Sequence, residues 1–477
     1  MARAARSSTT IGGPSQVSSE AGPYEHGQDR VTINMLPDDV LLEIFHFCVN
    51  HRSVGTSEWH TLVHVCQRWR HVVFASPRRL NLRLEYRGKR PVSEILDVWP
   101  VLPVVISYRF PKYWRNLSAA LKSEHRHRIC KIIISYIPTS HCKRLAAAMQ
   151  KPISGLTSGE LWVALNGANT AMSLPPGSFL GGSAPLLREL VLFNCPFPGI
   201  PKLLLSANQL VLLRLIHIPD SGYISPQDLG TALSVMSRLQ SFFLEFQSPL
   251  YPTSRLPPPP TRSVLPKLTF KGVHEYSEDL LAQTEAPLLN ELTVKFFMDI
   301  DFVLPQLRRL ISQAEWFKTC DRATVCTCDE QNLLKIYKGP HQSPYLFLHV
   351  ICSEFDSQLA SLAQVRSSIF PLLSTLVQLE IMNSAIFTPL WKATESRWLE
   401  LLAPFTAVKD LRLCYDFALP ICQALEELAE ERVTEVLPAL HNIFLRGLRP
   451  SESVPKYIEG FVAARRLSGH SVAVHGW

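Results

Sequence analysis

The chain has 477 residues, of which 46% are hydrophobic and 19% charged, and its formal net charge is +7. This composition excludes a wholly disordered protein, and the length excludes one ordinary compact core unless that core grows along a single axis. The 36 prolines indicate many short elements separated by turns. The mild positive charge permits an acidic partner but does not predict nucleic-acid binding, for which we expect a basic stripe.

The N-terminus and the cysteines bear on location. No apolar run approaches the roughly 18 residues that span a bilayer, and the apolar core of a secretion signal is missing. The eleven cysteines are scattered and odd in number, as expected of reduced thiols in the cytoplasm or nucleus. A mitochondrial presequence is the alternative, but Pro14 disfavours the long amphipathic helix it needs.

Residues 1–30 are small, polar and aperiodic, and predict a disordered tail. Residues 35–75 have helical spacing. Pro37 suits the first helical turn, and the first apolar stripe that follows comprises Val40, Leu41, Ile44, Phe45 and Cys48. A polar stretch at 50–57 interrupts the pattern. The second stripe, which we expect to be one helix ending before Pro77, comprises Trp59, Leu62, Val63, Cys66, Trp69 and Val73.

Beyond Arg78 the period changes, and a Leu-x-x-Leu-x-Leu motif with apolar variants recurs, mostly at spacings of roughly 23–33 residues. Leucine-rich repeats have periods of about 20–29 residues. The last three positions alternate and therefore predict a short strand with every second residue inward. These predicted strands lie at residues 132–134, 190–192, 213–215, 242–244, 268–270, 292–294, 379–381, 411–413 and 443–445.

Between the strands, residues 227–236 and 421–431 have helical spacing, so each repeat is expected to be one strand plus one helix. The gap between 294 and 376 contains a degenerate copy at 345–350. Asn194 is the best candidate for the asparagine that follows each strand of a regular repeat; most copies lack it. The Pro-rich residues 248–261 predict an extended surface loop, with a polyproline ligand as the alternative.

Two short motifs occur in order within residues 31–82. Residues 34–45 read N-M-L-P-D-D-V-L-L-E-I-F, and residues 62–70 place Leu, Val, Cys, Trp and Arg in the pattern L-x-x-V-C-x-x-W-R. Together they resemble the F-box, whose pattern is Leu-Pro, an acid, an apolar helix ending Ile-Phe, and then that second motif. The match covers about 45 of 477 residues, and the whole chain resembles the F-box proteins of mushroom-forming fungi.

The resemblance implies an α/β chain with a three-helix F-box at 31–82, followed by an irregular leucine-rich-repeat-like solenoid at 83–477 that binds a target. F-box proteins bind a Skp-type adaptor, and through it a cullin scaffold, as substrate receptors of SCF-type ubiquitin ligases. The resemblance implies no catalytic residue, cofactor, metal, nucleic acid or membrane. By position, the implied adaptor-binding residues are Leu36, Pro37, Val40, Leu41, Ile44, Phe45, Leu62, Val65, Cys66 and Trp69.

Several alternatives stay open. The N-terminal helices could simply cap the repeat array, the protein could be a scaffold that binds Skp without a cullin, or an enzyme could use the solenoid as a platform. Two departures from the family bear on adaptor affinity: an extra stretch at residues 51–56, and Arg79-Leu80 where a downstream tryptophan is common. Loop extension is cheap, on the order of 0.6 kcal/mol per doubling of length.

Other candidate chemistry is rejected. Cys326-x-Cys328, with Cys320 and His341, lacks metal-ligand spacing, and residues 125–128 (HRHR) are interpreted as a solvated loop rather than a phosphate site. The glutamates at 426–431 are interpreted as a solvated helix face. The target is expected on the concave, strand-lined face, where the mixed charges give no clear ligand sign. Exposed positions there are Arg188, Glu189, Arg214, Glu245, Lys295, Glu380 and Arg412.

Overall fold

The computed structural model describes residues 32–51, 59–109, 113–164, 179–195, 200–249, 261–262, 265–297, 304–328, 331–339, 346–351, 372–383, 395–428, 432–446 and 456–476. The predicted disordered tail and the Pro-rich loop lie almost wholly outside these ranges. The chain divides into two compact units at the peptide bond between Asn81 and Leu82.

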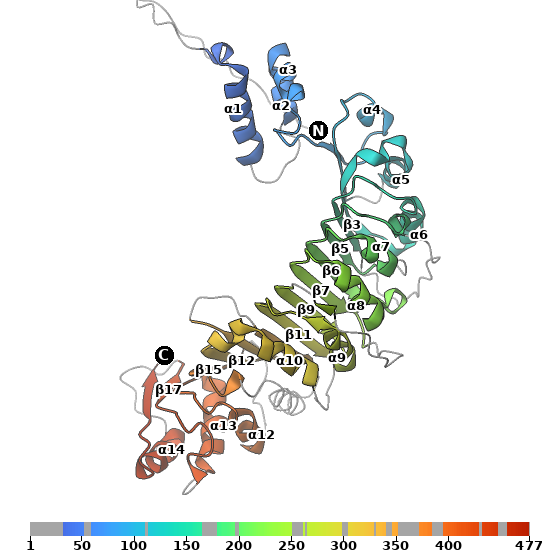
Figure 1. Ribbon diagram of the computed structural model, residues 1–477. Coiled ribbons are helices and arrows are strands. Elements are labelled where there is room, and N and C mark those ends of the chain that lie inside the picture. Colours follow the sequence, from blue (N-terminus) through green and yellow to red (C-terminus); the bar gives the residue numbers. More distant parts are fainter. Residues whose placement is uncertain are drawn as a thin grey trace, which may run out of the picture. The chain divides into compact units, whose positions relative to one another are not determined.

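The first unit is helical (Figure 1). A short 3-10 helix, η1 (Ile33–Met35), leads into α1 (Asp38–His51), and α2 (Trp59–Val65) and α3 (Gln67–Ala75) follow. Asp38 and Asp39 occupy the first turn of α1, where their charge interacts favourably with the helix dipole. The prediction of one continuous second helix is wrong, because the chain leaves helical geometry at Cys66.

In the residues that the structure describes, the second unit is built on one sheet of 16 strands, and Figure 1 shows α5 to α10 along one side of its first part. The strands, in chain order, are β1 (Leu84–Tyr86), β2 (Val104–Tyr108), β3 (Ile129–Ile137), β4 (Ser158–Val163), β5 (Glu189–Phe193), β6 (Leu212–Ile218), β7 (Ser241–Phe246), β9 (Lys267–Gly272), β11 (Glu291–Phe297), β12 (Arg322–Cys328), β13 (Gln331–Tyr337), β14 (Leu346–Ile351), β15 (Gln378–Asn383), β16 (Asp410–Leu413), β17 (Asn442–Leu445) and β18 (Ala473–Gly476). Two short strands, β8 (Thr261–Arg262) and β10 (Thr284–Glu285), pair separately.

Helices connect most of the strands. The α-helices are α4 (Ser93–Leu96), α5 (Trp114–Lys122), α6 (Thr139–Ala148), α7 (Ile200–Ser206), α8 (Pro226–Val235), α9 (His274–Ala282), α10 (Pro305–Gln313), α12 (Glu395–Leu402), α13 (Tyr415–Glu426) and α14 (Lys456–Leu467). The 3-10 turns are η3 (Glu124–Arg128), η4 (Phe179–Gly182), η5 (Asp220–Gly222) and η6 (Glu315–Thr319). The helix predicted at 227–236 is confirmed as α8. The one predicted at 421–431 begins earlier, as α13, and residues 429–431 lie outside the described ranges.

All nine predicted strands are confirmed, and most of the pairing is parallel. Register is kept by the inward residues: Leu190 pairs with Leu213, Leu213 with Phe242, and Phe242 with Leu268. These side chains are buried, so the repeats share one continuous apolar core that no single repeat could form. The fold is therefore mixed α/β with a long, mainly parallel, leucine-rich-repeat-like sheet.

The long gap in the repeat pattern contains an antiparallel insertion. The degenerate copy is confirmed as β14, which pairs in parallel with β11. β13 pairs antiparallel with both β14 and β12, and β12 pairs in parallel with β15. After β11 the chain first forms β12, three positions further along the sheet. It then returns through β13 and β14, so that β14 lies beside β11. The sheet continues unbroken through the gap.

Candidate protein-interaction surfaces

The N-terminal unit has a small aromatic core. Trp59 of α2 is 1% exposed and packs edge-on against Phe74 of α3, with ring centroids 5.9 Å apart. Phe45 of α1 is fully buried, 4.7 Å from the ring of Trp69. Burial of such rings is worth roughly 1.5–3 kcal/mol each, so these contacts hold the three helices together.

Arg68 joins the Leu-Pro turn to the third helix. Its guanidinium donates to the Oδ1 of Asp38 from Nε (3.0 Å) and Nη2 (2.7 Å), and Nη2 also donates to the carbonyl oxygen of Leu36 at 2.5 Å. The two halves of the sequence motif, 30 residues apart, therefore meet at the N-terminus of α1. A nearby arginine, Arg70, donates to the carbonyl of Val63 at 3.0 Å and fixes the turn between α2 and α3.

Cys66 is a helix cap. Its backbone is extended (φ −155°, ψ 170°), and its Sγ accepts a hydrogen bond from the Trp69 N–H at 3.5 Å. A thiol in this place satisfies one of the four N–H groups that a helix start leaves unpaired. The spacing Cys-x-x-Trp thus has a local structural reason, and the Cys66 side chain is partly buried.

The exposed apolar residues of α1 form a stripe of their own. Val40, Ile44 and Phe47 recur at four- and three-residue steps and are 39%, 36% and 62% exposed. Val65, at the end of α2, is 58% exposed, and Pro37 is also exposed. Two of the ten residues expected to contact an adaptor, Leu41 and Phe45, are instead fully buried in the unit's own core. Leu36, Leu62, Cys66 and Trp69 are half-buried.

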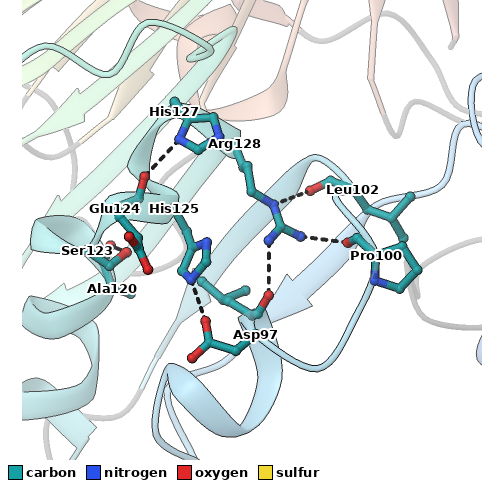
Figure 2. A network of polar contacts seen from close by, with 10 residues as sticks. Asp97, Pro100, Leu102, Ala120, Ser123, Glu124, His125, His127 and Arg128 are labelled. Carbon is teal, nitrogen blue, oxygen red and sulfur yellow. Dashed lines mark hydrogen bonds and ion pairs between the residues drawn. The ribbon is translucent and has the colours of Figure 1, made fainter.

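Residues 125–128 are not the solvated loop that was predicted. They form the 3-10 turn η3, whose Arg128 is 8% exposed. Figure 2 shows the Arg128 guanidinium donating to three backbone carbonyls of the preceding repeat, those of Leu102 (3.1 Å), Leu96 (3.0 Å) and Pro100 (2.8 Å). Alongside, His125 contacts Asp97 at 2.5 Å. The arginine is a structural anchor between repeats.

The same device recurs twice. Arg309 of α10 donates to the carbonyls of Leu281 (2.6 Å) and Thr284 (3.2 Å). Arg465 of α14, which is fully buried, donates to Val436 (3.1 Å) and Leu437 (2.6 Å). In each case the acceptors lie 25–29 residues earlier, in the turn where the previous helix gives way to a strand. In both places a guanidinium group therefore satisfies backbone carbonyls of the previous repeat.

Asn194 has a role of the predicted kind. It is left-handed (φ 53°), and its Nδ2 donates to the carbonyl of Ala164, 30 residues earlier, at 3.3 Å. The thiol of the next residue, Cys195, donates a hydrogen bond to the carbonyl of Leu161 at 3.6 Å. Two neighbouring side chains, those of Asn194 and Cys195, thus both hydrogen-bond to the preceding repeat.

The outward face of the strands carries the charges. Arg188 and Glu189 are exposed, whereas Arg214, Glu245, Lys295, Glu380 and Arg412 are half-buried. An ion pair joins Glu245 and Lys295, whose Oε1 and Nζ lie 3.7 Å apart. Aromatic side chains stand between these charges: Trp162 stacks on Phe193 at 4.9 Å, and Phe193 meets His217 edge-on at 4.9 Å. Sequence reasoning placed Glu245 and Lys295 on this face but missed the aromatic rings.

Among the described residues, no group of three or more His, Cys, Asp or Glu side chains is arranged to hold a metal. Cys320 and Cys326 are buried in the second unit, and His341 lies outside the described ranges. Within those ranges, no helix is both long and apolar enough to cross a bilayer.

Comparisons with known proteins assign no function to the chain. No family model matches the chain, and no curated protein matches it. A solved structure that it resembles is the leucine-rich repeat-containing protein LegL7 from Legionella pneumophila, with 13% sequence identity and a TM-score of 0.27. The alignment covers 81% of this chain and 97% of that one. The repeat architecture is established by the strand pairing, not by this likeness.

Proposed function

We propose that the chain is an F-box substrate receptor, which binds a Skp-type adaptor through its N-terminal unit and a target protein through its repeat sheet. The observation that carries the proposal is the exposed stripe of Val40, Ile44 and Phe47 on a helix introduced by Leu36-Pro37. A free surface helix normally presents polar residues there, and exposed apolar clusters mark interaction sites.

The contacts within the unit show structural roles for two further residues of the N-terminal unit, Arg68 and Cys66. Arg68 ties the Leu36 carbonyl and Asp38 to α3, and Cys66 caps the same helix. The Arg68 contacts hold the start of α1 against α3, so the stripe is presented on a preorganised helix. Leu41 and Phe45 act as core that supports the stripe, and the proposed adaptor contact is narrowed to Pro37, Val40, Ile44, Phe47 and Val65.

A helical cap on the repeat array is the competing function for these residues. A cap needs an apolar helix face, but it does not require Leu36-Pro37 ahead of the acids or the Val-Cys-x-x-Trp-Arg pattern at 65–70. An adaptor groove accounts for the stripe as well, since helix-in-groove recognition uses anchors at three- and four-residue steps.

The test is co-purification of the full chain with a Skp adaptor and a cullin. We expect the wild type to retain both, and the Pro37→Ala/Ile44→Asp variant to lose both. The matched control is Val98→Asp/Val101→Asp, which changes two valines that are 72% and 82% exposed in the second unit. Equal retention by all three proteins would refute the proposal, whereas adaptor binding without the cullin would favour a scaffold that takes no part in ubiquitination.

A further inference from the structure

The outward face of the sheet has an unbalanced row of positive charge. Glu245, Lys271, Lys295 and His349 are register partners on β7, β9, β11 and β14. Lys335 of β13 completes the group, with its Nζ 5.7 Å from the centre of the Phe347 ring, which in turn stacks on His349. We call these five residues the lysine row. It holds three lysines against one glutamate.

The row is costly for the fold alone. Like charges on directly opposed residues of neighbouring strands repel one another, and Lys271 and Lys295 are such a pair. Partial burial and the neighbouring Lys295 lower the pKa of Lys271, while Glu245 opposes that shift. Burial, Lys295 and Lys335 together lower the pKa of His349 to about 4. Burial is the main cause of both shifts, and the neighbouring lysines add to it.

The backbone beside the row is also strained. At the junction of β6 and β7, Ile216 and His217 together stand opposite Glu245, and His217 is in the left-handed region (φ 52°). This conformation costs a non-glycine residue about 1–3 kcal/mol and clusters at binding sites. The bulge directs the His217 ring toward Phe193, so the lysine row is continuous with the stacked rings of Trp162 and Phe193.

We propose that the lysine row and these adjoining rings bind an extended segment of the target that is rich in Asp and Glu and carries an aromatic residue. The proposal rests on the proposed function in assigning the sheet to target binding. The lysines occupy β9, β11 and β13 with β14 between the last two. At about 4.8 Å per strand they span about 14 Å, more than one phosphate group can bridge. Several carboxylates along an extended chain fit that span better.

Nucleic acid fits this face less well. Glu160, Glu245 and Glu291 lie on the same outward face of the sheet as the lysine row. Glu160 accepts a hydrogen bond from the indole of Trp162 at 2.7 Å. Glu291 is in an ion pair with Lys267. Surfaces that follow a phosphate backbone are dominated by cations, whereas a peptide can alternate its own charges with those of the sheet.

The test is fluorescence anisotropy of the full chain with a short labelled peptide in which Asp and Glu flank one Phe. We expect the triple variant Lys271→Gln/Lys295→Gln/Lys335→Gln to bind the peptide at least about tenfold more weakly than wild type. The control removes the same charge from exposed lysines outside the sheet, Lys122→Gln/Lys143→Gln/Lys151→Gln, and should bind within about twofold of wild type. Cooperative thermal melting of both variants, at or above the wild-type midpoint, checks that they fold.

Four results would overturn the inference: equal losses in both triple variants; equal binding of a peptide with Gln and Asn in place of Glu and Asp; tighter binding of a phosphoserine peptide that lacks the carboxylates; or tighter binding of oligouridylate. A second readout is the His349 pKa by NMR, which should rise when the acidic peptide binds. Adaptor binding is measured on the same proteins. If the protein binds the peptide but not the adaptor, only the proposed function is refuted. If it binds the adaptor but not the peptide, only this inference is refuted.

Discussion

Replacing Arg128 with methionine tests the idea that buried arginines join successive repeats. The change keeps the length of the side chain but removes three hydrogen bonds, to the carbonyls of Leu96, Pro100 and Leu102. Each hydrogen bond from a charged donor is worth about 1.5–3 kcal/mol, but removing a buried guanidinium also removes its desolvation penalty of several kcal/mol. The expected net loss in the free energy of unfolding is about 2–4 kcal/mol.

The assay is urea unfolding together with hydrogen exchange. We expect Arg128→Met to lower the urea midpoint and to raise exchange most in residues 84–137, because local stability in repeat proteins follows the affected interface. Arg126→Met is the control, since Arg126 lies two residues away on the same turn but outside the three-carbonyl contact. Equal effects of the two substitutions, or no effect of either, would show that the anchor contributes nothing.

Three further predictions concern single side chains. Trp59→Ala should cost about 3–5 kcal/mol and unfold the N-terminal unit, seen as lost helical circular dichroism; Ile44→Asp, at an exposed position, should leave that signal unchanged. Cys66→Ala should cost about 1 kcal/mol through the lost cap, and Cys66→Ser should restore it; equal urea midpoints for the two would contradict the capping role. Because the His349 pKa is lowered to about 4 in the folded protein, its contribution to the free energy of unfolding is full above about pH 6.5 and is lost as the pH drops toward 4. A His349→Gln variant whose stability depends on pH as in wild type would disprove this.

The repeat strands were predictable because alternation of leucines directly encodes an inward and an outward face. Strands without that pattern were missed. β4 has Gly159 at the inward position that leucine fills in β5, and β12 and β13 have no Leu-x-x-Leu-x-Leu motif of their own. Their antiparallel pairing depends on how a hairpin refills the sheet, which is a tertiary effect that local periodicity does not contain.

The sites were less predictable than the fold. On α1, Leu41 and Phe45 lie about 100° around the helix from Val40 and Ile44, so both pairs belong to one broad apolar stripe, and sequence could not tell which pair packs inward. Arg128 was read as solvated because its neighbours are polar. Its three acceptors come from the previous repeat, and no signal near residue 128 reveals them.

The lysine row shows the same limit. Its members come from five strands spread over residues 241–351, and only the strand order brings them together. Glu245 and Lys295 were predicted to lie on this face, but as separate mixed charges. The excess of lysine appears once β14 and β13 are placed beside β11.

The most direct test of the central claim is the dissociation constant of the full chain for a purified Skp adaptor, measured by calorimetry. Each buried aliphatic anchor contributes roughly 1.5–3 kcal/mol, so Val40→Asp/Ile44→Asp should weaken binding at least about a hundredfold, at 1.4 kcal/mol per factor of ten. Val98→Asp/Val101→Asp should leave it unchanged. No binding by the wild type, or the same constant for both double variants, would contradict the account.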